Sequence, residues 1–206
     1  MKSAINKIKW GKFIFLALAV LLFAFSFFFN KLYSNRTSVA REAGLAERYI
    51  RQQQQDFTDF LKDAALVERL ASKTETYHEL EKFTSKKYGI FLYKTGDFGE
   101  IKMLRWGDQL VVPPPEMFTA ADGEYFTQLS NGWYYIIKKT INGSGADLAF
   151  AMVPVWSEFF IETDYLPQQF IFSDEATKRV RLSTSATEFP VHTLSGKTLF
   201  YLEKKI

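Results

Sequence analysis

The sequence of 206 residues has no cysteine and only two histidines, and these absences exclude several kinds of chemistry. Without cysteine the chain has no disulfide, no thiol nucleophile and no cysteine-ligated zinc. Two histidines are too few for a three-histidine zinc site, and neither His78 nor His192 lies in a zinc-protease or serine-hydrolase motif. We therefore expect no catalytic residue, no metal site and no cofactor in this chain.

Acidic residues are absent from the first 41 positions, which carry seven Lys and Arg residues. The rest of the chain then has 19 basic against 23 acidic residues, a net charge of −4, although the whole chain is at +3. The basic character thus belongs to the N-terminal segment, and the following domain is mildly acidic. Its composition gives no support for nucleic-acid binding.

One long apolar run occupies residues 13–29 and contains no charged residue, no glycine and no proline. Its 17 residues are at the short end of what crosses a bilayer as a helix. Four lysines and no acid precede it, so the positive-inside rule predicts a cytoplasmic N-terminus at 1–12. We expect 13–30 to be an anchor in the cell inner membrane, with the remaining chain on the outside, in the periplasm of a Gram-negative bacterium.

Two alternatives for this run are less favoured. A buried core helix needs a polar stripe, and the run has only Ser26. A cleaved signal peptide needs small residues at a cleavage site, whereas this run ends in the bulky and then basic residues 27–31, FFFNK. An uncleaved signal anchor is the preferred interpretation.

The segment after the anchor predicts a long helix over 38–72, because its apolar residues recur at spacings of three, four and seven. A parallel dimer through this helix is expected, with Val39, Ala43 and Ala46 as candidate positions of the seam. A short helix is predicted over 76–86.

Five strands follow in the predicted order, at 88–94, 101–106, 124–129, 133–141 and 146–156. Gly-containing turns separate most of them, and Pro113-Pro114-Pro115 opens an irregular crossover that extends to about Gly123. The fold class is therefore α+β, with a long N-terminal helix packed on a five-stranded antiparallel sheet.

The last fifty residues are harder to interpret. Residues 159–170 fit either a helix or an extended segment, while 180–183 and 197–202 predict strands of a small membrane-proximal C-terminal subdomain. The chain ends directly after a predicted strand, so we expect a longer natural protein with a second, returning span.

This order of elements resembles the extracytoplasmic sensor region of bacterial membrane histidine kinases, of the PAS-like PDC or Cache type. The resemblance covers the anchor, the long helix and the sheet to about Trp156, and segments 160–166 and 194–202 add to it. It implies a sensor domain at 31–157, a membrane-proximal extension at 158–206, and a homodimer. It also implies a kinase and a response regulator that act through cytoplasmic domains absent from this chain.

Three further patterns do not carry chemistry. His78-Glu79-Leu80 is similar to the start of a kinase phosphoacceptor box, but the expected proline does not follow. Gly196-Lys197-Thr198 is similar to the end of a P-loop, but Val191 stands where the first glycine is needed, and Ser195-Gly196 predicts a hairpin turn instead. Glu162 and Asp164 are close in sequence, for which a solvated or capping role is favoured.

The family places its ligand pocket on the sheet face away from the long helix, under the crossover. Strand alternation and position then give six candidate ligand-binding residues: Arg105, Trp106, Asp108, Tyr125, Trp133 and Tyr135. Arg105 is the candidate partner of a ligand carboxylate. The opposing interpretation is that the aromatic residues are ordinary core and Arg105 lies on the surface.

Three functions remain open from the sequence. The first is a signal-input region that senses a small molecule or an envelope cue. The second is an anchored periplasmic interaction or assembly protein without enzymatic activity. An anchored hydrolase is the least favoured, since no nucleophile and base are recognisable.

Overall fold

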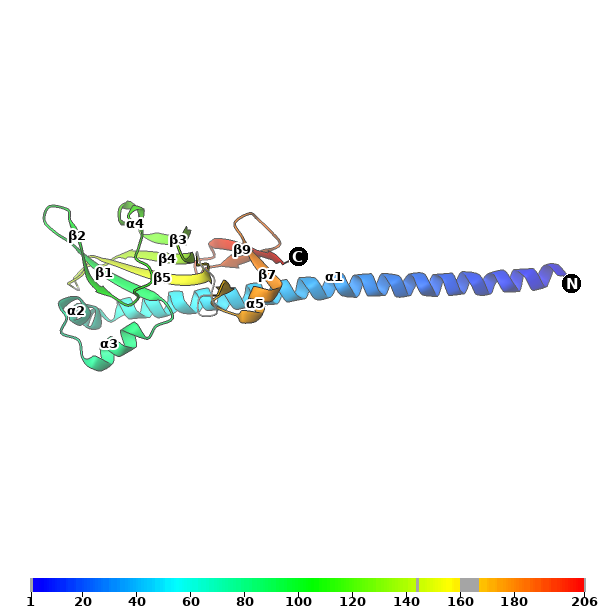
Figure 1. Cartoon of the computed structure of the whole chain (residues 1–206), viewed down its shortest axis with the longest axis horizontal. Coiled ribbons are helices and arrows are strands. Elements are labelled where there is room, and N and C mark those ends of the chain that lie inside the picture. The colour runs from blue at the N-terminus through cyan, green and yellow to red at the C-terminus, as the bar shows by residue number, and fades with distance from the viewer. Residues whose placement is uncertain (1, 144, 160–166, 206) are drawn as a thin grey trace.

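The computed structural model describes the backbone of residues 2–143, 145–159 and 167–205, without the side chains of 2–14, 27 and 29–37. Helix α1 (Lys2–Lys62) is a single helix of 61 residues. It extends far beyond the folded domain on its N-terminal side, as Figure 1 shows. The apolar run at 13–29 and the start of the predicted helix at 38 therefore lie on one continuous helix.

The predicted helix over 38–72 is in fact two helices, and that part of the prediction was wrong. Helix α1 ends at Lys62, and α2 (Ala64–Ser72) begins after Asp63. The backbone of Asp63 is not helical, with ψ at 74°, and its carboxylate accepts a hydrogen bond from the Leu66 amide at 3.0 Å. Asp63 thus ends one helix and caps the next, a role that its short acidic side chain favours.

Helix α3 (Tyr77–Thr84) starts with a capping box, in which Thr76 and Glu79 each bond the other's backbone amide. The sequence predicts this helix with ends one or two residues too far out. Lys73 lies between α2 and α3 in the left-handed region, with φ at 60°, and its amide donates to the carbonyls of Arg69 and Leu70 in α2.

The main sheet is antiparallel and follows the order β2-β1-β5-β4-β3. Its strands are β1 (Gly89–Thr95), β2 (Ile101–Trp106), β3 (Gly123–Leu129), β4 (Gly132–Thr140) and β5 (Leu148–Ser157). The α+β class and the five-stranded sheet are confirmed. A sixth strand of two residues, β6 (Gln169–Phe170), extends the pairing of β5, at the end of the segment for which the sequence left a helix and an extended conformation open.

The two faces of this sheet carry separate apolar clusters. One face packs against α1, with Ile50 and Phe57 in one apolar cluster with Leu92, Tyr135 and Ala149. The opposite face, called here the crossover face, holds Phe91, Tyr93, Tyr134, Ile136, Phe150 and Met152. Residues of the crossover segment cover it, including the one-turn helix α4 (Glu116–Thr119).

A second, three-stranded sheet follows, with the order β7-β9-β8. It consists of β7 (Val180–Ser183), β8 (Phe189–His192) and β9 (Thr198–Lys204), preceded by α5 (Asp174–Arg179). The strands predicted at 180–183 and 197–202 are confirmed, as is the turn at Ser195-Gly196, where Gly196 has φ at 82°. Strand β8 was missed because it is short and contains Pro190.

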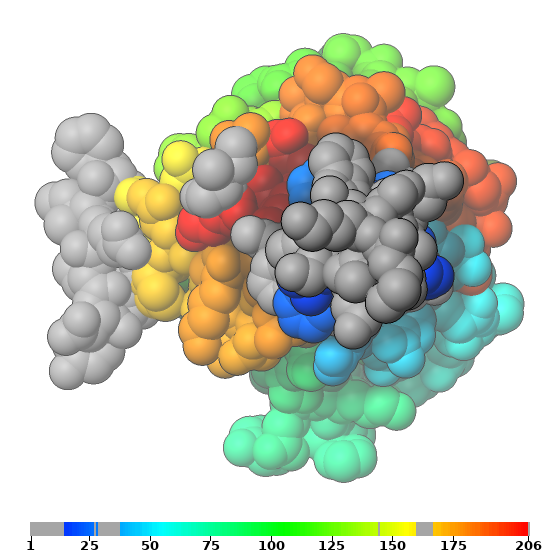
Figure 2. All heavy atoms as spheres, turned by 90° about the vertical axis from the view of Figure 1, so that its right-hand side faces the viewer, coloured from blue at the N-terminus to red at the C-terminus, as the bar shows by residue number. Residues whose placement is uncertain are grey.

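The small sheet lies along α1, on the side nearer the N-terminus (Figure 1). Viewed along α1, its orange and red strands lie beside the blue and cyan helix (Figure 2). Val39, Ala43 and Ala46 of α1 are buried in the cluster that includes Val191 and Phe200 of this sheet. These three positions, expected at a dimer seam, are therefore covered by the chain's own C-terminal part.

Some predictions fall outside the described residues. The segment 160–166, with Glu162 and Asp164, is one of them. In the described part of the chain, no helix has the length and hydropathy of a membrane span. The anchor at 13–29 stays a prediction, and the side chains of residues 13, 14, 27 and 29 are among those not described.

The two sheets are joined by an aromatic stack, which gives a test of the fold. Phe126 of β3 stacks on Phe200 of β9 with the ring centroids 4.8 Å apart. We expect Phe200→Ala to lower the free energy of unfolding by about 3–5 kcal/mol, because the ring is fully buried. The measurement is denaturant unfolding of Phe200→Ala and of Tyr201→Ala, which changes a half-buried neighbour. An equal loss of the free energy of unfolding in both variants would contradict the role of the Phe126–Phe200 stack in joining the two sheets.

Candidate functional site

The six predicted ligand-binding residues lie on both faces of the main sheet. Tyr135 is fully buried in the cluster that packs on α1, and Trp133 stacks on Phe126 at 5.2 Å, on that same side. Trp106 pairs with Phe91, and Tyr125 packs against the cluster of the crossover face. The structure therefore does not bring the aromatic candidates together around one cavity.

Arg105 pairs with Leu92 of β1 and so lies on the α1 side of the sheet. Its guanidinium forms an ion pair with Glu75, in the segment between α2 and α3. The Glu75 side chain is 4% exposed, and Arg105 Nε and Glu75 Oε2 are buried without a hydrogen-bond partner in the described part of the chain. Arg105 thus fixes the α2–α3 connection to β2, on the α1 side of the sheet and not on the crossover face.

Asp108 follows β2 in a turn, where its Oδ1 accepts a hydrogen bond from the Leu110 amide at 2.9 Å. Tyr125 likewise has a local partner, since its hydroxyl donates to the Ala121 carbonyl at 2.6 Å. Both side chains shape the two ends of the crossover segment. Of the six candidates, these two lie closest in sequence to the crossover under which a ligand was expected.

The crossover face contains a buried cation that sequence reasoning missed. Lys138 of β4 is 4% exposed, and its Nζ donates to the carbonyl oxygens of Phe118 at 2.9 Å and of Ala120 at 2.6 Å. In the described residues no carboxylate forms a salt bridge with it. The alternation of β4 predicts which of its residues share a face, but not that α4 covers this lysine.

Three aromatic rings adjoin this lysine on the crossover face. The Phe118 ring meets Tyr93 edge to face at 4.9 Å and Phe150 at 5.2 Å between centroids, and Tyr93 and Phe150 meet at 5.8 Å. Burial raises the pKa of the Tyr93 hydroxyl to about 12, so Tyr93 is neutral at physiological pH. The crossover face is therefore filled by aromatic side chains from the sheet and from α4.

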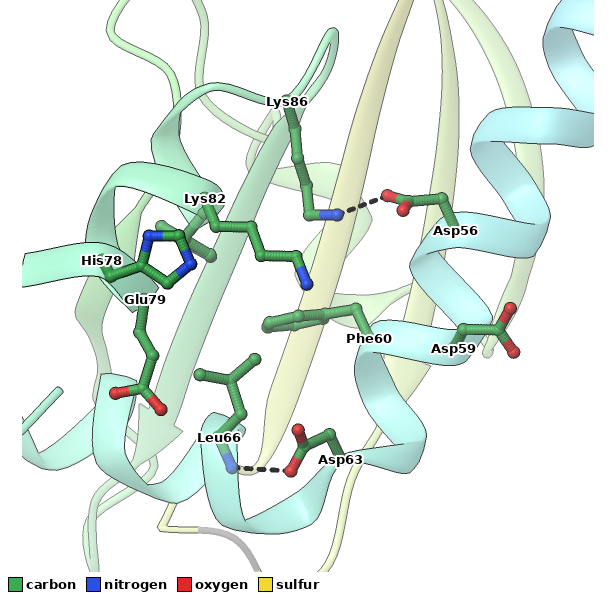
Figure 3. Close-up of a pocket in the computed structure, with 10 residues that line it drawn as sticks. Asp56, Asp59, Phe60, Asp63, Leu66, His78, Glu79, Lys82 and Lys86 are labelled. Carbon is green, nitrogen blue, oxygen red and sulfur yellow. Dashed lines mark hydrogen bonds and ion pairs between the residues drawn. The ribbon is translucent and has the colours of Figure 1, made fainter. Parts of the chain in front are cut away.

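A separate cleft of about 360 Å³ lies where the end of α1 meets α2 and α3. Its apolar floor includes Phe60, Leu66 and Phe83, and Asp56 and Asp63 line its α1 side. Figure 3 shows Lys82 of α3 extending into this cleft above Phe60. The cleft joins elements that lie at the end of the domain farthest from the N-terminus (Figure 1).

Most charges of this cleft already have partners. Asp56 accepts hydrogen bonds from Lys86 Nζ at 2.5 Å and from the Tyr88 hydroxyl at 2.6 Å. Burial raises the pKa of the Asp56 carboxyl, but these two hydrogen bonds outweigh it, so the pKa lies below its ordinary value. The bond from Arg69, together with those from the amide and hydroxyl of Thr76, lowers the pKa of Glu79 to about 2.

A third polar region joins α1 to the C-terminal part of the chain. Glu42 of α1 is 1% exposed and accepts a hydrogen bond from Ser173 Oγ at 3.4 Å, with Arg179 Nη1 at 3.7 Å. One turn and a half further along, Glu47 accepts from the His192 amide at 3.2 Å and lies 3.0 Å from its Nδ1. These contacts fix α5 and β8 to one register on α1.

The same region reaches the edge of the main sheet. Gln54 of α1 accepts from the Leu194 amide at 2.8 Å and donates to Glu124 of β3 at 2.6 Å. Ser195 Oγ donates to the other Glu124 oxygen at 3.0 Å, and Lys197 Nζ donates to the Glu124 carbonyl at 2.5 Å. Sequence reasoning missed this junction, and the signal that could have found it is the polar pair Gln53-Gln54 within the apolar stripe of the helix.

Comparisons with protein-family models, with curated proteins and with solved structures find no match for this chain. Among the described residues, no group of three or more His, Asp or Glu side chains could hold a metal ion.

The ion pair of Asp56 gives a pH-dependent test. A carboxyl with a lowered pKa in the folded state contributes stability above its unfolded pKa of about 4, which is lost as the pH falls through the folded value. We expect Asp56→Asn to cost about 1 kcal/mol at pH 7, after allowance for solvent screening, and clearly less at pH 3. Urea unfolding at both pH values measures this difference.

The matched control for this test is Asp97→Asn, which changes an exposed residue in the turn between β1 and β2. Its effect should be small and similar at both pH values. A cost of Asp56→Asn that stays the same from pH 7 to pH 3 would show that the charge of Asp56 does not stabilise the fold.

Proposed function

We propose that this chain is the extracytoplasmic signal-input region of a two-component sensor histidine kinase, with a PDC/Cache-like, PAS-like sheet. The observation that carries the proposal is that α1 runs without a break from the apolar run at 13–29 to the main sheet. A movement of the domain at the C-terminal part of α1 would therefore be transmitted along one continuous helix to the apolar run. The kinase activity and the response regulator belong to cytoplasmic domains outside this chain.

The order of elements supports the PAS-like part of the proposal. A long helix precedes the sheet and packs on one face, and the five strands follow the order β2-β1-β5-β4-β3. The irregular crossover between β2 and β3 covers the other face. This is the arrangement on which the resemblance to sensor domains depends.

The exposed side chains of α1 support the membrane anchor at 13–30, with the N-terminus in the cytoplasm and the domain in the periplasm. Phe15, Leu16, Leu21 and Phe23 are each between 63% and 77% exposed. Apolar side chains in an unbroken run of this kind are costly in water and favourable in the hydrocarbon core of a bilayer. The cell inner membrane is thus the proposed location.

The coding sequence beyond codon 206 tests the proposal directly. We expect a second apolar span, a phosphoacceptor helix and an ATP-binding domain in the same reading frame. A stop codon at 207 would refute the kinase and favour the alternative, an anchored periplasmic interaction or assembly protein.

Dimerisation through the exposed side of α1 is part of the proposal. Arg48 and Gln55 lie seven residues apart and are exposed on one side of the helix, whereas Ala46 is fully buried. We expect Arg48→Cys and Gln55→Cys to give disulfide-linked dimers in membranes. Ala46→Cys should give none, because the small C-terminal sheet of the same chain covers this position. Gel electrophoresis without reductant is the measurement, and monomers at both exposed positions would contradict a parallel pair.

A further inference from the structure

The crossover face places a charged lysine under a helix of only four residues. Taking an ammonium group out of water is costly unless strong partners compensate it, and buried lysines usually pair with carboxylates. Lys138 instead bonds two neutral carbonyl oxygens at the C-terminal end of α4. In the part of the chain that the structure describes, no salt bridge supplies the missing negative charge.

Helix α4 is held to the sheet by few contacts. The backbone hydrogen bonds of residues 116–120 stay within 114–120, and Thr119 Oγ1 also bonds locally, to the Glu116 carbonyl. Among the described residues, the hydrogen bonds that tie α4 and Ala120 to the sheet are the two from Lys138. The remaining attachment is apolar, through Met117 and the half-buried Phe118.

Both ends of this segment have contacts of their own. Pro113 is buried before α4, within a run of three prolines of restricted conformation. After α4, the Asp122 carboxylate accepts hydrogen bonds from the Thr140 amide and hydroxyl at 2.7 and 2.8 Å. The two hydrogen bonds from Lys138 and the apolar contacts of Met117 and Phe118 are therefore the contacts that hold the middle of this segment on the sheet.

The carbonyl group and the phenyl ring of Phe118 contact the sheet in the way that the carboxylate and the ring of a small aryl-substituted acid would. Its carbonyl oxygen meets the ammonium of Lys138, and its phenyl ring lies against Tyr93 and Phe150. Two carbon atoms, Cα and Cβ, separate the carbonyl carbon from the ring. The same atoms make up 3-phenylpropanoate, in which a charged carboxylate replaces the neutral carbonyl.

We propose that Lys138, Tyr93 and Phe150 form a binding site for small arylalkanoic acids, in which Phe118 of α4 occupies the place of the ligand. A carboxylate would give the ammonium a charged partner, and hydrogen bonds between charged groups are roughly twice as strong as those between neutral groups. The ring of the acid would replace that of Phe118 between the two sheet rings, which conserves the edge-to-face contacts. Binding would displace α4 from the crossover face.

This site goes beyond the proposed function, which names no ligand. Lys138 takes the role expected of Arg105, which is already paired with Glu75 on the other face. The binding test does not depend on a kinase. A gene that ends at codon 207 would refute the signalling role and leave this site intact, whereas a lack of binding would refute the site alone.

The test uses the chain of residues 1–206 in lipid nanodiscs and isothermal titration with 3-phenylpropanoate. We expect binding, together with a rise in the thermal unfolding midpoint. Butanoate, which lacks the ring, and 3-phenylpropanamide, which lacks the charge, should each bind at least about tenfold more weakly, since each loses one of the two contacts.

Two lysines next to each other provide the matched variants. Lys138→Met removes the buried ammonium and should weaken binding at least about tenfold, whereas Lys139→Met changes an exposed neighbour on the same strand and should leave affinity unchanged. Near-ultraviolet circular dichroism checks that both variants fold. Equal affinity of Lys138→Met and the unaltered chain would overturn the proposal.

Phe118→Ala tests displacement of α4 and keeps the lysine in place. Removing the competing ring should tighten binding of 3-phenylpropanoate severalfold, because the ligand no longer has to expel it. If neither the unaltered chain nor Phe118→Ala binds 3-phenylpropanoate, the proposed site is overturned. Weaker binding by Phe118→Ala than by the unaltered chain would also overturn it, since the Phe118 ring would then be part of the site and not its occupant.

Discussion

The burial of one side of α1 is the interaction on which the rest of the structure depends. Ala46 and Ile50 are fully buried and Phe57 is 1% exposed, and the same apolar cluster contains residues of both sheets. The main sheet and the small sheet are thus organised around a common helix. Helix α1 continues without interruption from this packing to the apolar run at 13–29.

The two halves of this packing differ in chemistry. Near the main sheet, α1 contributes large apolar side chains such as Phe57, whose burial favours one close-packed arrangement. Beside the small sheet it contributes small residues together with Glu42 and Glu47, which bond Ser173 and His192. Hydrogen bonds and ion pairs are directional, so this part fixes the register of the small sheet along the helix. The proposed signalling role would depend on such a defined register between the small sheet and α1.

Much of the fold was predictable, and the reasons are local. The alternation of the strands, the glycines at the turns and the spacing along 38–62 each act within a few residues, and the structure confirms the elements they predict. The helix break at Asp63 and strand β8 were missed because a single cap and a four-residue strand leave little periodicity. The candidate site was harder, since alternation shows which residues of a strand share a face but not which element covers that face.

By itself, the sequence determined the α+β class, the order of the five strands along the chain and the absence of cysteine. Only the tertiary structure decided that Arg105 faces Glu75 and that the candidate aromatic residues lie on opposite faces. It also decided that Lys138, one of two adjacent lysines, is the buried one. The physical reason is that the environment of a charge is set by segments distant in sequence, here α4, whose position depends on how the crossover packs on the sheet.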